Sequence, residues 1–374
     1  MIVRFWGVRG STPTPSIANL KYGGNTPCVE VRTGGGQLII MDAGTGIRAL
    51  GKRLMAETPP EGHRIMLFIS HYHWDHIQGI PFFEPMYAPG NFVYMHGFET
   101  AQASVEKALG EQMMTPYFPV DSSVMRATRH LYAVGEEVLQ IGDAVVTTRF
   151  LNHPQGCLGY RVEADGHALV YATDNEHGSP VHDRNIRELA KNADMLIFDT
   201  QYTPEEYLSK QGWGHSTWEK GVEIAKEVGV RELVLFHHDP DHGDVFLDRM
   251  LEATRRCFPN TIAAMEGMEV DLSAGGAYRT AFEKRYAPRH TLSVPLVLRM
   301  GKSATKDERK VYVTSLSLDG AHFVSDSAME IGSTFEAELE FPGQTGPGGG
   351  IKSVARVMRC EKLGDKFGIG VSFR

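Results

Sequence analysis

The apolar residues of this chain occur in short runs, and several of these runs end directly before a histidine or an aspartate. Strand-like runs such as Ile65–Ile69, Ala168–Ala172 and Glu232–Phe236 are separated by loops and by helical stretches. The helical pattern is expected at Gly46–Met55, Phe98–Gly110, Arg184–Ala193, Thr217–Val228 and Val245–Phe258. Strands that come first as meanders and later alternate with helices predict a layered α/β fold.

The pattern changes between residues 268 and 285, where apolar periodicity is lost. From Thr291 onward apolar and polar residues alternate in five or six short segments, which predicts a small antiparallel β-barrel. The tract Gly343–Gly350 is too rich in glycine for the inside of a sheet and is expected to be a hairpin loop. These features divide the chain into residues 1–270, a linker at 271–284 and residues 285–374.

The length of 374 residues is enough for two domains with cores of their own. No apolar run reaches the ~18 residues of a membrane span. Two arginines within the first nine residues, with no apolar stretch after them, do not fit a signal peptide, so a cytoplasmic location is expected. The four cysteines lie far apart in the sequence, which excludes a cysteine-based zinc site.

The net charge of −8 is divided unequally along the chain. The first 282 residues carry 24 Lys and Arg against 35 Asp and Glu, whereas the remainder carries 14 against 11. An acidic body lacks the broad positive field that binds a polyanion. We therefore expect a small ligand, with no large nucleic acid and no membrane as partner, and we leave a homo-oligomer open.

Four residues that can bind metal follow the strand-like run IMLFIS within the sequence HYHWDH: His71, His73, Asp75 and His76. In an extended segment residues 71 and 73 point to the same side, and the other two begin the next turn. One short loop can therefore present four ligand atoms to a small volume.

Three further residues each follow an apolar run: His153, Asp174 and His237. Strand ends meet at one edge of a layered α/β fold, so these residues can complete a shared site, although His237 beside His238 is by itself equally compatible with a structural role. Five histidines and two aspartates are enough for two divalent metal ions with a carboxylate between them. This ligand chemistry favours Zn²⁺, and Mn²⁺ or Fe²⁺ stays open.

The order HxHxDH, His, Asp, His resembles the metallo-β-lactamase fold, an αββα sandwich, over about residues 1–270. The resemblance implies that His71, His73 and His153 bind one metal, that Asp75, His76 and His237 bind the second, and that Asp174 bridges them. The flanking segments FWGVRGSTPTP, YGGNTPC, DAGTGIR, DHIQGIPFF and LFHHDP are similar to the phosphodiesterase side of the superfamily, near tRNase Z and the cyclic-phosphate hydrolases.

Two more residues fit that branch. His215 precedes Ser216 and Glu219, which form a capping-box signature for a helix, and it resembles the histidine that contacts the scissile phosphate or protonates the leaving oxygen. Asp42 is expected to orient a ligand histidine by hydrogen bonding, with a simple turn before Gly44 as the alternative. With His215, we expect Asp75 to act in catalysis.

The C-terminal segment carries Arg285 and Arg289 four residues apart, followed by Ser315, Ser317 and Gly320 and by a closing GIGVSF. This pattern resembles the PilZ domain, a small antiparallel β-barrel that binds cyclic di-GMP. The family usually has Asp or Asn at the position of Ser315, whose hydroxyl cannot read a guanine edge in the same way. The alternative is a barrel that only packs or dimerises.

The function expected from these features is a dinuclear metal-dependent phosphodiesterase that acts on a small or cyclic phosphodiester and is regulated by cyclic di-GMP. One alternative is a non-catalytic cyclic di-GMP receptor that mediates contact with partners. Another is RNA processing of the tRNase Z type, against which the acidic body and the missing basic, glycine-rich arm argue.

Overall fold

The computed structural model describes residues 1–374 apart from positions 58, 60, 275–276, 281–289, 303–304, 318–319, 341–350, 364–365 and 374. The chain forms two compact units, Met1–Ala281 and Phe282–Arg374. Within the described parts of the chain, no helix has the length and apolar character needed to cross a lipid bilayer.

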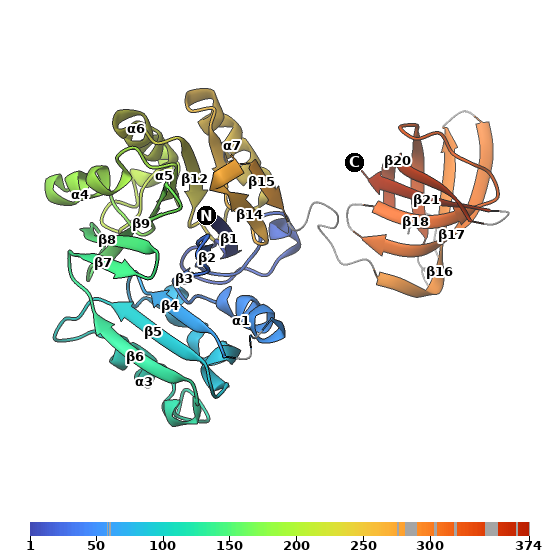
Figure 1. The fold of residues 1–374 in the computed structure, drawn as a ribbon. Helices are drawn as coiled ribbons and strands as arrows, with labels where there is room; N and C mark the ends of the chain where they lie inside the picture. Colours follow the sequence, from blue (N-terminus) through green and yellow to red (C-terminus); the bar gives the residue numbers. More distant parts are fainter. Residues whose placement is uncertain are drawn as a thin grey trace. The chain divides into compact units, whose positions relative to one another are not determined.

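Two β-sheets form the centre of the first unit, and helices cover their outer faces (Figure 1). The first sheet has the order β15 (Ala277–Thr280), β14 (Met268–Asp271), β1 (Ile2–Gly7), β2 (Cys28–Arg32), β3 (Leu38–Met41), β4 (Arg64–Phe68), β5 (Phe92–Gly97) and β6 (Thr128–Ala133). The second has the order β13 (Thr261–Ala263), β12 (Glu232–Phe236), β11 (Met195–Asp199), β10 (His167–Ala172), β9 (Cys157–Ala164), β8 (Ala144–Leu151) and β7 (Val138–Ile141).

The helices pack on the two sheets through separate apolar clusters. On the first sheet lie α1 (Ile47–Ala56), α2 (Trp74–Ile77) and α3 (Val105–Gln112), and on the second lie α4 (Pro180–Ala190), α6 (Trp218–Val228) and α7 (Asp244–Cys257). The remaining short helices are α5 (Pro204–Tyr207) and the 3-10 turns η1 (Ile17–Asn19), η2 (Ile80–Phe82), η3 (Glu84–Tyr87), η4 (Ser122–Val124) and η5 (Leu272–Ala274). The predicted αββα sandwich is confirmed.

A third apolar cluster fills the space between the two sheets. Phe5 and Phe68 from the first sheet and Tyr160, Tyr171 and Phe236 from the second are fully buried there. Each such side chain contributes about 1.5–3 kcal/mol by leaving water. The parallel registers of β3 with β4, and of β10, β11 and β12 with one another, set several strand ends level with one another.

The structure differs from the sequence-based expectation at several places, including the following three. Helix α3 begins at Val105 rather than Phe98, because Ser104 accepts a hydrogen bond from the Lys107 amide and caps it. Strands β6 and β7 were not predicted, since their side chains are largely exposed and leave no apolar alternation. Residues 277–280 of the predicted linker form β15, which pairs with β14 and so belongs to the first unit.

The second unit is a closed antiparallel barrel, as the alternating pattern predicts. Its strands follow the order β16 (His290–Lys302), β17 (Thr305–Ser317), β18 (Gly320–Ser325), β21 (Lys366–Phe373), β20 (Ile351–Leu363) and β19 (Thr334–Glu340). Val313, Phe323, Val357, Ile369 and Val371 lie buried in its core. The predicted hairpin loop Gly343–Gly350 lies outside the described residues.

His96 on β5 links the fold of the first unit to pH. Its ring stacks on the rings of Phe68 and Tyr132, with distances between ring centroids of 4.4 and 5.0 Å. Its Nδ1 atom has no hydrogen-bond partner. Burial lowers the pKa of His96 to about 4. The unfolded chain takes up this proton near pH 6.5, so stability falls as the pH drops from that value towards 4.

We predict that His96→Phe removes this loss of stability at acid pH. Between about pH 7.5 and about pH 5, the free energy of unfolding of the variant should fall by about 2 kcal/mol less than that of the unsubstituted protein. Urea titrations at the two pH values measure the difference. The matched control is His130→Phe, which replaces an exposed histidine stacked on Tyr94; equal pH profiles for both variants would contradict the prediction.

Candidate metal centre

Five separate segments of the first unit bring the predicted ligands and the predicted catalytic residue His215 together. His71, His73, Asp75 and His76 lie in the loop after β4 and the start of α2. Three others follow strands of the second sheet, namely His153 after β8, Asp174 after β10 and His237 after β12. His215 lies shortly before α6. The site therefore lies where loops from the two sheets meet.

The first group of ligand atoms belongs to His71, His73 and His153, all within 4.8 Å of one another. The His153 Nε2 atom lies 3.1 Å from His73 Nδ1 and 3.8 Å from Asp174 Oδ1. His71 Nε2 lies 3.7 Å from the same aspartate oxygen.

The second group is formed by Asp75, His76 and His237, again with ligand atoms within 4.8 Å of one another. The Nε2 atoms of His76 and His237 lie 3.1 and 3.2 Å from Asp75 Oδ2. They also lie 3.2 and 3.3 Å from Asp174 Oδ2. One carboxylate, Asp174, thus faces the first group with Oδ1 and the second with Oδ2.

Hydrogen bonds outside the cluster fix which nitrogen of each histidine faces inward. His76 Nδ1 lies 2.7 Å from Asp42 Oδ2, His237 Nδ1 lies 2.8 Å from Gln201 Oε1, and His153 Nδ1 lies 2.9 Å from the Gly214 carbonyl. Each partner atom is an acceptor, so each Nδ1 carries the proton and each Nε2 turns a lone pair inward. Asp42 therefore holds a histidine in orientation as well as forming the turn.

These lone pairs and carboxylates fit divalent cations. While both rings are neutral, neither Nε2 of His76 and His237, which lie 3.3 Å apart, can donate to the other, and buried His71 Nε2 has no hydrogen-bond partner. Such a convergence of acceptors is unfavourable unless positive charge lies among them. Imidazole and carboxylate ligands without thiolate match Zn²⁺, Mn²⁺ or Fe²⁺.

The pKa values of His76 and Asp174 also indicate that the cluster favours positive charge. Burial alone would lower the pKa of His76, but Asp75, Asp174 and Asp42 hold it well above its usual range. Burial would raise the pKa of Asp174, yet the surrounding histidines His237, His76 and His71 keep it well below its usual range. For His71, burial and the neighbouring His76 lower the pKa strongly.

Three residues of the cluster adopt left-handed backbone conformations. The φ angles of Asp42, Asp174 and His237 are 61°, 52° and 59°. This conformation costs a residue with a side chain about 1–2 kcal/mol, and such strain is concentrated at functional sites. Here it turns side chains from the ends of β3, β10 and β12 towards one another.

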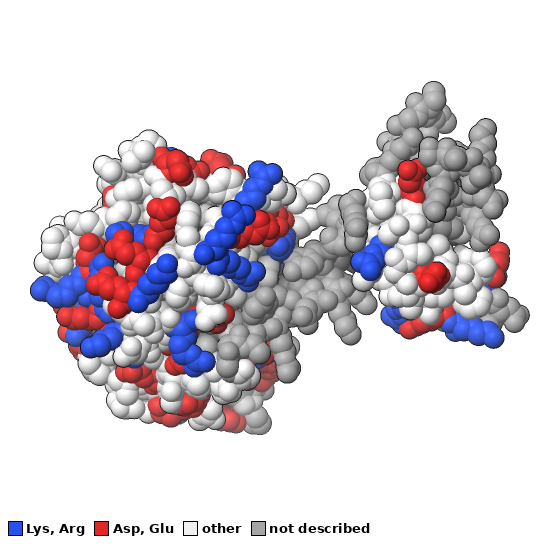
Figure 2. Space-filling model, turned by 90° about the horizontal axis from the view of Figure 1, so that it is seen from above, with Lys and Arg blue, Asp and Glu red and all other residues white. Residues whose placement is uncertain are grey.

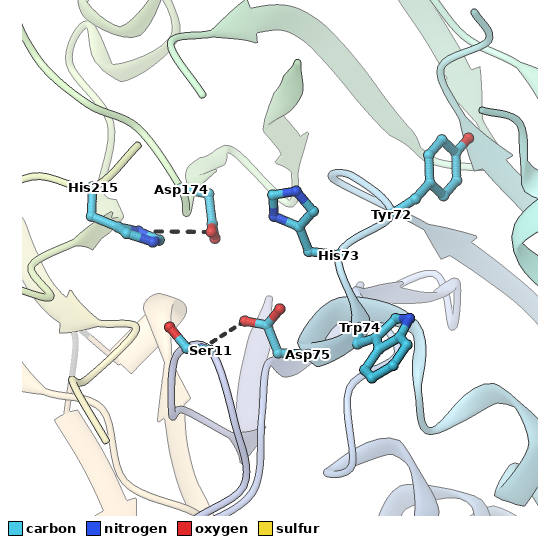
Figure 3. A pocket seen from close by; sticks show the side chains of 7 residues that line it. All are labelled: Ser11, Tyr72, His73, Trp74, Asp75, Asp174 and His215. Carbon is cyan, nitrogen blue, oxygen red and sulfur yellow. Dashed lines mark hydrogen bonds and ion pairs between the residues drawn. The ribbon is translucent and has the colours of Figure 1, made fainter. Parts of the chain in front are cut away.

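His215 lies beside the cluster and lines the cleft above it (Figure 3). Its Nδ1 is 2.8 Å from Asp199 Oδ2, which leaves Nε2 for another group. Burial lowers the pKa of His215, but Asp199 outweighs burial and raises it to about 9. The predicted cap is wrong: Thr217, not Ser216, caps α6, and Ser216 Oγ instead lies 2.8 Å from His177 Nδ1.

Sequence reasoning missed several residues that support the site. Gln201 and Asp199 hold His237 and His215, and the Ser11 amide donates to Asp75 Oδ2 at 2.8 Å. The buried Glu176 carboxylate accepts from the amides of Gly212 and Gly214 and so fixes the carbonyl that orients His153. The motif context of Ser11 and the strand-end position of Asp199 are the only sequence signals for these roles.

The residues expected to bind cyclic di-GMP are only partly described. Arg285 and Arg289 lie outside the described residues, and Ser315 and Ser317 lie on β17 with side chains that are likewise outside them. Gly320 begins β18, and a Cβ atom there would lie 2.0 Å from the Val371 carbonyl oxygen. The close strand approach at this position therefore requires glycine.

Comparison with known proteins identifies both units. The family described as "Beta-lactamase superfamily domain" matches residues 37–238, just over half of the chain. The chain belongs to the β-lactamase superfamily. Its residues 283–374 match the family described as "PilZ domain", so the predicted resemblances to both families are confirmed.

Relatives of the β-lactamase superfamily unit include ribonuclease Z enzymes. The ribonuclease Z of Brevibacillus brevis is 29% identical over 175 residues, which cover 46% of this chain and 48% of the relative, so the chain spans about half of that enzyme. The ribonuclease Z of Methanosarcina acetivorans is 25% identical over 316 residues, covering 72% and 97%. The metallo-β-lactamase fold protein YhfI from Bacillus subtilis shares the fold, with 20% identity, a TM-score of 0.54, and coverage of 72% and 97%.

We predict that Gly10→Ala weakens the second group of ligands. A Cβ atom at Gly10 would lie 2.5 Å from His237 Nδ1 and 2.8 Å from Gln201 Oε1, so it would push the ring away from its partner. Zinc affinity, measured by competition with a chromogenic chelator, should fall by about 10–100-fold, as is typical when the support of a ligand is lost. Gly135→Ala, where the new Cβ meets open space, is the control and should bind zinc unchanged.

Proposed function

We propose that the first unit is a phosphodiesterase with two divalent metal ions, most favourably Zn²⁺, and that its substrate is a small or cyclic phosphodiester. The observation that carries this proposal is the convergence of five histidines on the carboxylates of Asp75 and Asp174. In this assignment His71, His73 and His153 hold one cation, Asp75, His76 and His237 hold the other, and Asp174 lies between them. A cytoplasmic location stays part of the proposal.

Two bound cations supply positive charge that neutralises phosphate oxygens and lowers the pKa of water. The chain's own groups divide the remaining tasks. Asp75, held by the Ser11 amide, fixes the second cation and accepts a proton from the attacking water. His215, held through Nδ1 by Asp199, donates a proton from Nε2 to the leaving oxygen. Water adds to phosphorus as the bond to the leaving oxygen breaks, giving a phosphomonoester and an alcohol, which are parts of one molecule when the diester is cyclic.

The excess of Asp and Glu over Lys and Arg in the first 282 residues, 35 against 24, supports a small substrate. On the face shown in Figure 2, acidic and basic side chains are interspersed on the larger described part, without a continuous basic field. A backbone-tracking RNA interface requires such a field. The ribonuclease Z relatives favour RNA processing as a second candidate function, and cleavage of a precursor tRNA by the zinc-loaded protein, faster than that of small diesters, would establish it instead.

We predict that His73→Ala and His215→Ala separate metal binding from proton donation. His73→Ala should lose bound zinc and at least about 100-fold in activity towards any phosphodiester. His215→Ala should keep its zinc and lose about 100-fold or more in kcat with an alkyl leaving group. With p-nitrophenolate, which leaves without a proton, the loss should be much smaller.

Metal analysis and paired assays of aryl and alkyl diesters measure these effects. His182→Ala is the control, because His182 bonds Ser179 at α4, outside the cluster. An activity that His73→Ala leaves unchanged would not arise at this cluster, and it would favour the non-catalytic receptor. Loss of zinc from His215→Ala would instead make His215 a ligand, in keeping with its place near Asp174 and His153.

We further propose that the PilZ domain binds cyclic di-GMP through Arg285, Arg289, Ser315, Ser317 and Gly320, and that this binding regulates hydrolysis. The family match and the position of Gly320 on β18 support this proposal. Ser315 has no carboxylate, so it forgoes a charge-assisted hydrogen bond worth about 1.5–3 kcal/mol.

We predict that Ser315→Asp tightens cyclic di-GMP binding by about 10–100-fold and that Arg289→Ala abolishes it. Isothermal titration calorimetry on the full chain measures both. Hydrolysis rates with and without saturating dinucleotide test regulation, with Arg289→Ala as the unresponsive control. Equal rates despite measured binding would reject regulation, and no binding even by Ser315→Asp would favour a barrel that only packs or dimerises.

A further inference from the structure

The cleft above the metal cluster has a polar side and an aromatic side. It has a volume of about 420 Å³ and is lined by Ser11, Tyr72, His73, Trp74, Asp75, Asp174 and His215. In Figure 3, His215 and Asp174 face each other on one side, whereas Tyr72 and Trp74 lie beyond His73 on the other. A ligand centred on the cluster therefore meets two aromatic side chains from the loop after β4.

Trp74 is largely exposed to solvent although it lies next to the candidate metal ligands. It lies between the candidate ligands His73 and Asp75, yet 80% of its surface is open to solvent. The neighbouring aromatic ring is fixed, since Tyr72 donates a hydrogen bond from Oη to the Phe98 carbonyl (2.5 Å) and packs on the Phe98 ring. A large exposed ring at the rim of a cleft offers a flat apolar face on which a planar ligand can stack.

The charges of the cleft do not favour ionic contacts with parts of a ligand beyond its scissile phosphate. Of the seven described residues that line it, none is lysine or arginine, and two are aspartates. Cations at the cluster and the protonated His215 face the scissile phosphodiester, and the lining has no lysine or arginine left to neutralise further phosphates. Affinity beyond the scissile phosphate must therefore come from contact with uncharged surface.

We propose that Trp74 is a stacking platform for a planar ring attached to the scissile phosphodiester, which makes nucleotides and other aryl-bearing diesters the substrate class. The ring stands one residue from two candidate metal ligands, so a base linked to the bound phosphate through a single sugar lies within reach of it. Every nucleobase has a face that stacks, so the platform selects for a base without selecting which one. This inference rests on the proposed function for its link to catalysis.

The first test measures equilibrium binding and needs no turnover. Zinc-loaded full-length protein is titrated calorimetrically with adenosine monophosphate and with ribose phosphate, which carries the same charged group without a base. The ratio of the affinity for adenosine monophosphate to that for ribose phosphate should fall by about 10–100-fold in Trp74→Ala. It should change little in Trp74→Phe. Trp213→Ala is the matched control: Trp213 is also exposed (58%), but it lies outside the cleft lining and under the Lys210 ammonium group at 4.2 Å.

The second test measures turnover of cyclic AMP and of glycerophosphoethanolamine, a diester without a planar ring. Trp74→Ala should raise KM about 10–100-fold for cyclic AMP only, with little change in kcat. A base preference that Trp74→Ala removes in a protein without hydrolysis would support the platform and overturn the proposed function. The platform would be overturned if Trp74→Ala weakened the ligand with a base and the ligand without one equally, in binding or in turnover. It would also be overturned if Trp213→Ala reduced the base preference as much as Trp74→Ala does.

Discussion

The carboxylate of Asp42 joins the two sheets of the first unit at the point where the candidate metal ligands meet. It accepts hydrogen bonds from the Ser70 amide and hydroxyl, each at 2.7 Å, and from the Tyr171 hydroxyl of β10 at 2.7 Å. The same carboxylate holds His76 Nδ1. With four donors around one buried charge, the loops after β3 and β4 and the strand β10 have one favourable arrangement, and the ligand geometry follows from it.

The cluster concentrates features that a stable core normally avoids. Left-handed backbone at Asp174 and His237, two facing imidazole acceptors and an unpartnered nitrogen on His71 lie within one small volume. Their cost is offset by the apolar layers on both sides of each sheet, where Phe68, Tyr160 and Phe236 are fully buried. A site of this kind needs a rigid support larger than itself.

The sequence predicted the layers, and it singled out candidate ligands that the fold brings together, because both depend on local signals. Buried strands such as Glu232–Phe236 are short apolar runs. The sequence HYHWDH places four residues that can bind metal in one loop. The exposed β6 and β7 carry no such signal, and the helix boundary at Ser104 depends on a hydrogen bond that the periodicity does not show.

The supporting contacts could not be predicted, because they join residues far apart in the chain. Glu176 acts on His153 only through the backbone of Gly212 and Gly214, and Gly10 matters only because His237 packs on it. The cap at Thr217 shows the limit of motif reasoning, since Ser216 next to it satisfies the same pattern but bonds His177 instead.

The candidate ligand residues come from loops of both sheets, so a bound cation would also affect how much folded protein a cell keeps. A cation that binds only the assembled cluster adds its binding free energy to that of folding, about 4 kcal/mol at a thousandfold excess over its dissociation constant. Cation supply would then set how much of the chain escapes proteolysis, as well as how much of it is active. A shortage of metal would thus lower the amount of this protein before any change in its synthesis.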